Sequence, residues 1–172
     1  MKATGIVRRI DDLGRVVIPK EIRRTLRLRE GEALEIYTGE TGEVIFKKYS
    51  QVGESAEKAL DLCESMWRTV GLPAAVCDRD RVLTAAGPAR KEVTEKPVTD
   101  ELDTLMQQRR PYRHTGEKPV RITENGPTVL CMAPIINDGD VTGCVAFFGE
   151  EKSVAGEAEM KVVQSSAAFL GK

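Results

Sequence analysis

The sequence predicts two domains, a small basic unit of short strands and one helix followed by a larger acidic α+β domain. The charge is divided, because residues 1–53 carry a net charge of +3 and the remainder carries −4. A short polar connector, residues 51–55, separates the two parts. Short alternating apolar segments precede it, whereas a helical periodicity begins directly after it. The predicted domains are therefore residues 1–50 and 56–172.

Composition limits the class of protein. The 172 residues are 41% hydrophobic and 31% charged, which is typical of a soluble globular protein. No apolar run approaches the roughly 20 residues that cross a bilayer, and the amino end lacks the apolar core of a signal peptide. We expect a cytoplasmic protein without membrane association. The division of charge indicates that only the first domain meets a polyanion.

Four short strands and one helix are predicted in residues 1–50. Residues 5–10 and 15–18 alternate as strands, and the turn between them ends at Gly14, which tolerates positive φ. Pro19 ends the second strand and has the backbone angle of a first helical turn, so a helix is predicted over 20–28. The other two strands form a hairpin, with residues 33–37 and 43–47 flanking the loop 38–42.

The predicted helix has an apolar stripe and a basic face. Ile22 and Leu26 share the stripe at about 100° per residue. Residues 1–29 hold nine basic and three acidic side chains, a net charge of +6. Arginine suits phosphate and guanine because its planar fork donates two hydrogen bonds. An ordinary solvated helix face is the alternative. We predict a surface for double-stranded DNA, whose binding residues are Arg8, Arg9, Arg15, Lys20, Arg23, Arg24 and Arg27.

A unit of about 50 residues buries only roughly 60% of the surface of its extended chain and is marginally stable alone. Residues 1–50 contain neither a disulfide pair nor a set of metal ligands, so oligomerisation is the expected source of stability. A dimer with intertwined strands would also close the exposed strand edges.

Helices and hairpins alternate over residues 56–172. Apolar spacings of three and four predict a long helix over 56–70, capped by Ser55 and ended by Gly71. A short charged helical segment, a helix that opens at Thr99 and runs to about Arg109, and a final helix through Leu170 follow. Strands are expected at 74–78, 81–85, 120–123, 128–136 and 141–148. This order predicts an antiparallel sheet covered by the terminal helices.

Candidate chemical sites are few. The cysteines lie in apolar segments without a C-x-x-C pair, so we expect small buried side chains at Cys63, Cys77, Cys131 and Cys144. His114 is the only histidine and is expected on a surface loop, so no zinc site is predicted. No set of residues indicates catalysis, a metal or a cofactor.

Four segments in the first domain, TGIVR (4–8), LGRVVIP (13–19), EIRRTL (21–26) and ALEIY (33–37), follow one another along the chain. In this order they resemble the AbrB-type DNA-binding domain of bacterial transition-state and sporulation regulators. The resemblance implies a swapped-hairpin β-barrel, in which two chains interleave into one DNA-binding unit. It also implies that the DNA-contacting arginines are Arg8, Arg15, Arg23 and Arg24.

The order of helices and strands in residues 56–172 is similar to that of a GAF domain, a small-molecule-sensing α+β fold. Together, the two domains resemble transcriptional regulators of spore-forming bacteria that assemble as homotetramers, with long helices bundling two dimers. The helix over 56–70 fits such a bundle and equally fits packing within its own domain. Small side chains on the strands, such as Thr128 and Ala146, either leave a cavity for an unidentified ligand or pack closely.

The resulting hypothesis is a sequence-selective regulator of transcription, of sporulation genes, acting as activator or repressor on the nucleoid. A first rival is an antitoxin, because related swapped-hairpin modules occur in toxin–antitoxin pairs, usually with a short disordered tail. Here residues 56–172 are instead predicted to be folded. A second rival is a metabolite-binding module or enzyme that acts through these residues.

Overall fold

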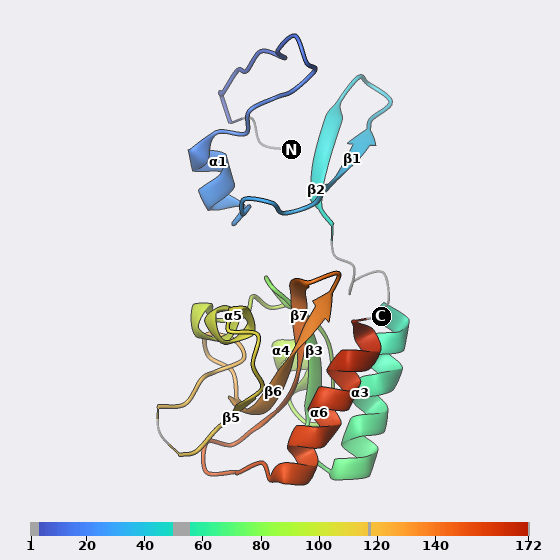
Figure 1. Cartoon of the computed structure of the whole chain (residues 1–172), viewed down its shortest axis with the longest axis vertical. Helices are drawn as coiled ribbons and strands as arrows, with labels where there is room; N and C mark the ends of the chain where they lie inside the picture. Colours follow the sequence, from blue (N-terminus) through green and yellow to red (C-terminus); the bar gives the residue numbers. More distant parts are fainter. Residues whose placement is uncertain (1–3, 50–55, 117, 172) are drawn as a thin grey trace. The chain divides into compact units, whose positions relative to one another are not determined.

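The computed structural model describes residues 4–49, 56–116 and 118–171 (Figure 1). The chain divides into two compact units, residues 1–49 and 50–172. The predicted connector, residues 51–55, and the predicted cap at Ser55 lie outside the described residues.

The amino-terminal unit contains a short helix and a hairpin. Helix α1 spans Lys20–Thr25, and strands β1 (Leu34–Thr38) and β2 (Val44–Lys48) pair antiparallel. The predicted hairpin is confirmed within one residue at each end. Helix α1 ends before residue 28, because Arg27 adopts a left-handed backbone with φ of 50°. The backbone N–H groups of Arg27 and Leu28 then donate to the carbonyls of Arg24 and Arg23, which closes the helix.

The segments 5–10 and 15–18, predicted as strands, form no strand in the described unit. The turn between them does form, since Gly14 has φ of 75° and its N–H donates to the Asp11 carbonyl. The sheet of this unit consists of β1 and β2 alone among the described residues. A strand requires a neighbour to pair its backbone groups. The single chain supplies none for these two segments.

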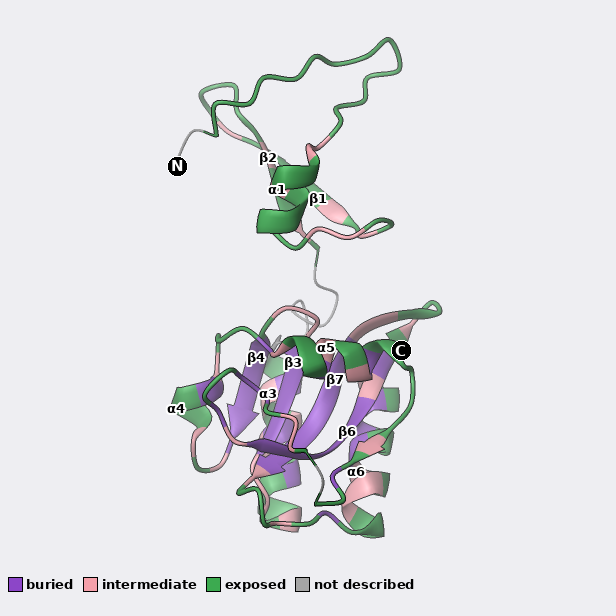
Figure 2. Ribbon diagram, turned by 90° about the vertical axis from the view of Figure 1, so that its left-hand side faces the viewer, coloured by how far each residue is buried: buried purple, intermediate pink, exposed green. Residues whose placement is uncertain are grey.

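Apolar side chains of the amino-terminal unit remain in contact with solvent. No residue of 4–49 is buried, as Figure 2 shows by its lack of purple in this unit. Val7 is 84% exposed and Val17 is 72% exposed. The apolar stripe of the helix is only partly covered, because Ile22 is half-buried while Leu26 is 56% exposed.

A five-stranded antiparallel sheet forms the centre of the carboxy-terminal unit, with strand order β4-β3-β7-β6-β5. The long hairpin of β6 and β7 lies beside β3, so that Ala74 pairs with Phe147. The strands are β3 (Ala74–Asp78), β4 (Val82–Ala86), β5 (Tyr112–Arg113), β6 (Thr128–Asn137) and β7 (Asp140–Gly149).

Helices cover this sheet on both faces. Helices α3 (Ala56–Val70) and α6 (Glu157–Leu170) lie side by side on one face (Figure 1). Their core includes Met66, Val163 and Phe147, each at most 3% exposed. Helices α4 (Arg90–Val93) and α5 (Asp100–Gln107) belong to the other face, where Leu102 packs with Phe148 in a second core. The prediction of an antiparallel sheet covered by helices is confirmed.

Two predicted helix boundaries are also confirmed. The Thr99 side chain accepts a hydrogen bond from the backbone N–H of Leu102 at 3.2 Å, which caps α5. Gly71 has φ of 80°, and its N–H donates to the Trp67 carbonyl at the end of α3.

The edge of the sheet differs from the prediction. Residues 120–123 form no strand but a single bridge between Arg121 and Thr128, because the chain turns back at once through Gly126. The edge strand is β5 instead. Its continuation buries His114, which is 2% exposed and donates its backbone N–H to the Leu130 carbonyl. The expected surface position of His114 is therefore wrong. The expected burial of all four cysteines is confirmed.

Candidate nucleic-acid interface

Helix α1 presents basic side chains to solvent. Pro19 precedes it with φ of −58°, and the Arg23 N–H donates to the Pro19 carbonyl at 2.9 Å, so proline begins the first turn as its fixed φ favours. Lys20, Arg23 and Arg24 are all exposed. A helix of six residues has little stability of its own, so its orientation depends on how its ends are held.

The exit of α1 is held by contacts with the hairpin. The Lys48 ammonium donates to the Arg27 carbonyl at 3.0 Å and lies 3.4 Å from the Glu32 carboxylate. Glu32 in turn accepts a hydrogen bond from the Arg29 backbone N–H at 2.7 Å. Strand β2 thus fixes the point at which α1 ends, with the exposed Arg27 at that point. Sequence reasoning missed Lys48 and Glu32, because only the hairpin register brings them beside the helix exit.

Arg15 is fixed by the turn that precedes it. The Asp11 Oδ1 atom accepts the backbone N–H groups of Leu13 at 3.0 Å and Arg15 at 2.8 Å, while Oδ2 accepts the Arg15 Nε–H at 2.8 Å. The backbone hydrogen bond from Arg15, and then the one from its side chain, lower the pKa of Asp11 below its ordinary value. Asp11 is therefore ionised at neutral pH. The sequence indicated a turn here but not this contact.

Most of the predicted DNA-binding cations lack an acidic partner. Within the described residues, no ion pair or hydrogen bond from the side chain engages Arg8, Arg9, Lys20, Arg23 or Arg24. The structure places Lys20, Arg23, Arg24 and Arg27 on α1 and its exit, Arg15 after the turn, and Arg8 and Arg9 before it. Unpaired, exposed arginines are suited to phosphate oxygens.

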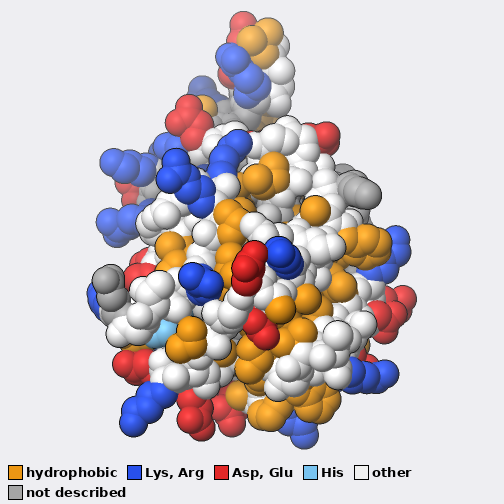
Figure 3. All heavy atoms as spheres, turned by 60° about the horizontal axis from the view of Figure 1, so that its bottom comes forward, with side chains coloured by type: hydrophobic (Ala, Val, Ile, Leu, Met, Phe, Trp, Pro, Cys, Tyr) orange, Lys and Arg blue, Asp and Glu red, His pale blue; other side chains and the backbone are white. Residues whose placement is uncertain are grey.

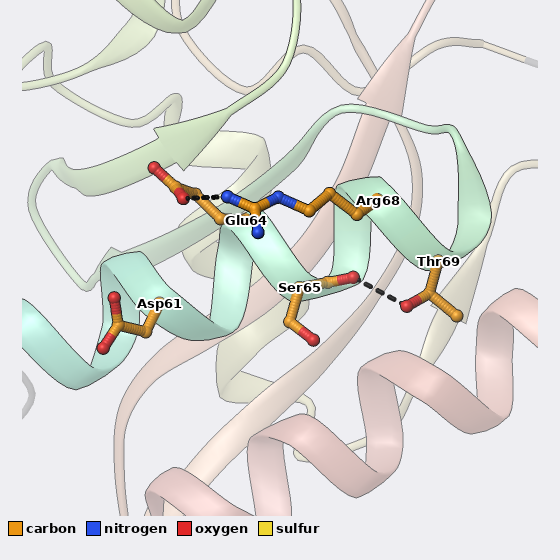
Figure 4. Close-up of a pocket in the computed structure, with 5 residues that line it drawn as sticks. All are labelled: Asp61, Glu64, Ser65, Arg68 and Thr69. Carbon is orange, nitrogen blue, oxygen red and sulfur yellow. Dashed lines mark hydrogen bonds and ion pairs between the residues drawn. The ribbon is translucent and has the colours of Figure 1, made fainter.

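A pocket of the carboxy-terminal unit lies on the outer face of α3 (Figure 4). Its lining includes an ion pair between Arg68 and Glu64 at 2.9 Å, and the Thr69 hydroxyl donates to the Ser65 carbonyl at 2.8 Å. All of the lining side chains come from one helix, and the only ion pair with another element that involves them among the described residues is that of Glu64 with Arg90 of α4, at 3.9 Å. This arrangement favours an ordinary helix surface over a site for chemistry. The lining residues are Asp61, Glu64, Ser65, Arg68 and Thr69.

Other classes of site are not supported by the described residues. No group of three or more His, Cys, Asp or Glu side chains among them is arranged to hold a metal ion. No helix in the part of the chain that the structure describes has the length and apolar character to cross a membrane. Figure 3 shows Lys and Arg side chains interspersed with Asp and Glu and with hydrophobic side chains on the face it presents.

Comparison with protein families matches both parts of the chain. Residues 54–172 match the family described as Stage V sporulation protein T C-terminal, transcription factor. Residues 7–53 match the family described as Antidote-toxin recognition MazE, bacterial antitoxin. The first match covers more than half of the chain.

Individual relatives agree with this division. Stage V sporulation protein T of Bacillus subtilis (strain 168) is 41% identical over 175 residues, which covers 100% of this chain and 98% of that protein. Transition state regulatory protein AbrB of the same strain is 61% identical over 49 residues, 28% of this chain and 50% of that protein. The solution structure of the N-domain of the transcription factor abrB is 61% identical, covers 28% of this chain and 92% of that chain, and gives a TM-score of 0.26. The relation to that domain therefore rests on sequence identity.

Proposed function

This chain belongs to the family of stage V sporulation protein T, and we propose that it is a DNA-binding regulator of transcription in sporulation. The observation that carries the proposal is the exposed basic surface of the amino-terminal unit, in which five cations have no partner among the described residues. The 61% identity of this unit to transition state regulatory protein AbrB supports it.

The DNA would be held first by its phosphates. Lys20, Arg23, Arg24 and Arg27 on α1 and its exit would neutralise phosphates and release counterions, which makes binding depend on salt. Arg8, Arg9 and Arg15, from the segments before and after the turn, would extend the contact along the duplex. Phosphate contacts set the register, whereas preference among sequences comes from base edges and from the shape of the DNA.

The proposed DNA-binding unit is a dimer of swapped hairpins, formed by residues 1–50 of two chains. The exposed apolar side chains and the unpaired segments 5–10 and 15–18 support this proposal, because strands of a second chain would cover the former and pair with the latter. The carboxy-terminal unit would act as a GAF-like regulatory domain and join two dimers into a homotetramer through its helices. The assembly would act in the cytoplasm, on the nucleoid.

A small-molecule ligand of the GAF-like domain is proposed from the resemblance alone. Both faces of its sheet are filled by buried side chains, among them Phe147 on one face and Phe148 on the other, each fully buried. A ligand would therefore have to displace packed side chains. A thermal-shift screen of metabolites on the full chain would test for it, and a raised melting temperature would support a sensing role.

The DNA-binding proposal is tested by measuring the affinity for genomic duplex fragments over a range of salt concentrations. We expect log affinity to fall linearly with log salt. Arg23→Ala and Arg24→Ala should each weaken binding by roughly tenfold and lower the slope by about 1 for each phosphate that is no longer neutralised. Arg68→Ala is the matched control, since Arg68 is an exposed arginine of the other unit, paired with Glu64. Salt-independent binding, or equal effects of all three variants, would contradict the proposal.

An antitoxin function is the second candidate, and the match of residues 7–53 to a bacterial antitoxin family is the observation in its favour. A folded carboxy-terminal unit with two cores argues against it, because a toxin-binding tail is expected to be extended. Limited proteolysis distinguishes the two: a resistant fragment containing residues 56–171 supports a regulator, and rapid digestion of that region supports an antitoxin.

A further inference from the structure

An aspartate stands within the basic surface of the amino-terminal unit and contacts one of its arginines. Asp11 accepts the Nε–H of Arg15 at 2.8 Å. A carboxylate at a polyanion-binding surface weakens attraction to any duplex, because it repels phosphate. We propose that Asp11 is a positioning residue that orients Arg15 for DNA, so that it raises sequence selectivity while lowering general affinity. The proposal rests on the proposed function.

The two oxygens of Asp11 have different roles. Oδ1 accepts the backbone N–H groups of Leu13 and Arg15, at 3.0 and 2.8 Å, and so holds the turn. Oδ2 accepts the Arg15 Nε–H, at 2.8 Å, and so holds the side chain. The turn and the guanidinium are therefore fixed by the same carboxylate, and the guanidinium keeps a set relation to the backbone.

The hydrogen bond from Nε to Asp11 leaves the two Nη groups of Arg15 free to bind DNA. A guanidinium has five N–H donors, of which Nε carries one and the two Nη atoms carry four. Within the described residues Arg15 has no other side-chain partner than Asp11, so both Nη groups are available. Their fork matches guanine O6 and N7 or two phosphate oxygens. A flexible arginine would have to lose its rotamer freedom on binding, whereas the contact with Asp11 already restricts the Arg15 side chain.

The neighbouring Asp12 provides a control for charge. It has the same charge and is also exposed, but within the described residues its side chain forms no hydrogen bond or ion pair. Removal of either carboxylate changes the electrostatic attraction to DNA in the same way. Only removal of Asp11 releases Arg15.

The experiment compares Asp11→Asn and Asp12→Asn in the full chain on two short duplexes. One duplex is enriched by the wild-type chain from a random-sequence pool, and the other has the same composition in shuffled order. Asparagine keeps an oxygen that can accept the turn hydrogen bonds but removes the carboxylate partner of Nε. We define the affinity ratio as the affinity for the enriched duplex divided by the affinity for the shuffled duplex. We expect Asp12→Asn to strengthen binding to both duplexes by a similar factor and to leave this affinity ratio unchanged.

Asp11→Asn should strengthen binding to the shuffled duplex as Asp12→Asn does, but lower the affinity ratio by roughly tenfold. A collapsed turn would instead weaken binding to both duplexes, so the ratio separates positioning from a structural role. Arg15→Lys tests the same contact from the other side and keeps both the charge and the backbone bonds of the turn. Arg15→Lys should lower the affinity ratio about as much as Asp11→Asn does. The double variant, Asp11→Asn with Arg15→Lys, should lower the affinity ratio little further.

Equal ratios for Asp11→Asn and Asp12→Asn would overturn the positioning role, as would fully additive effects in the double variant. Both of these outcomes leave DNA binding itself intact. A wild-type chain that binds no duplex would overturn the proposed function instead, so the two failures are distinguishable.

Discussion

The two units of this chain differ most in where their apolar side chains lie. In the carboxy-terminal unit, buried residues fill both faces of the sheet, and Phe147 and Phe148 are fully buried on opposite sides. In the amino-terminal unit, no residue of 4–49 is buried, and Val7 and Val17 are among the most exposed apolar side chains. One unit contains its own core, whereas the other presents the parts of a core that a second chain would complete.

This difference follows from size and from function. A basic surface for DNA requires exposed arginines, and a unit of this size is too small to bury most of its apolar side chains without a partner. The larger unit has no such demand, so its strands are buried on both faces. The comparison indicates that stability is concentrated in one unit and recognition in the other.

The largest expected effect comes from truncating a core side chain. Phe147→Ala should lower the unfolding free energy of the carboxy-terminal unit by about 3–5 kcal/mol, because apolar burial is reduced and a cavity is left behind. Trp67 is the only tryptophan and lies in α3, so its fluorescence reports this unit in a denaturant titration.

The matching change in the other unit is Val17→Ala. Substitution of an exposed side chain changes the unfolding free energy by about 0.5 kcal/mol or less. In the proposed dimer Val17 is covered, so we expect Val17→Ala to lower the unfolding free energy by about 1 kcal/mol or more, and the unfolding transition to depend on protein concentration. Circular dichroism measures it while the Trp67 signal stays unchanged. A negligible cost at every concentration would show that Val17 is solvent-exposed in the native protein and would weaken the dimer proposal.

A second pair of substitutions contrasts the backbones of the two units. An added Cβ at Gly143 would lie 2.0 Å from the Cys77 carbonyl oxygen on the neighbouring strand. Gly143→Ala should therefore cost about 1–3 kcal/mol, because β3 and β7 must move apart. An added Cβ at Gly14 has no atom within 4 Å. Gly14→Ala should therefore lower the unfolding free energy by about 1 kcal/mol, only because alanine is disfavoured in the left-handed backbone conformation, with φ of 75°. If Gly14→Ala proved the more costly, the turn would be packed against something in the native assembly.

Alkaline pH should destabilise the carboxy-terminal unit alone through its thiols. Burial raises the pKa of Cys63 and of Cys131 from 9.0 to about 12. The unfolded chain therefore releases these protons first, and the stability present below pH 9 is lost as pH rises toward 12. Between pH 8 and 10 we expect a decrease on the order of 1 kcal/mol per thiol.

The variant that isolates this effect is Cys131→Ala, whose stability should decline less steeply over the same range than that of the wild type. The Trp67 transition measures both proteins. An unchanged dependence on pH would show that the Cys131 thiol is accessible to water in the native state.

The smallest expected effect is at the exit of α1. Arg27 has φ of 50°, a conformation in which glycine is favoured over other residues. Arg27→Gly should raise the unfolding free energy of the amino-terminal unit by about 0.5 kcal/mol and its melting temperature slightly. The relief of backbone strain in the folded state exceeds the conformational entropy that glycine adds to the unfolded chain. Arg24→Gly, inside the helix, is the control and should destabilise the unit by about 1 kcal/mol. A lower melting temperature for Arg27→Gly would indicate that the Arg27 side chain contributes more than its backbone costs.

Local patterns were sufficient where a segment depends on its own residues. The apolar spacing over α3, the end of α3 at Gly71 and the Thr99 cap of α5 are properties of short stretches, and each is formed as predicted. The basic surface is likewise visible in residues 1–29, because charge and exposure go together.

Other features depend on partners that are distant in the chain. Strand β5 and the burial of His114 exist because β6 lies alongside, and a segment of two residues carries no periodicity of its own. The strands predicted at 5–10 and 15–18 have suitable residues but no neighbour to pair with in a single chain.

The sequence by itself determined the two-part organisation, the types of most elements and the basic character of the first unit, because periodicity and charge are local quantities. Only the tertiary structure decided which edge of the sheet is closed by β5, that Lys48 and Glu32 hold the exit of α1, and that Asp11 holds Arg15. These contacts depend on distance in space, which residue spacing along a chain does not specify until turns and strand register are set.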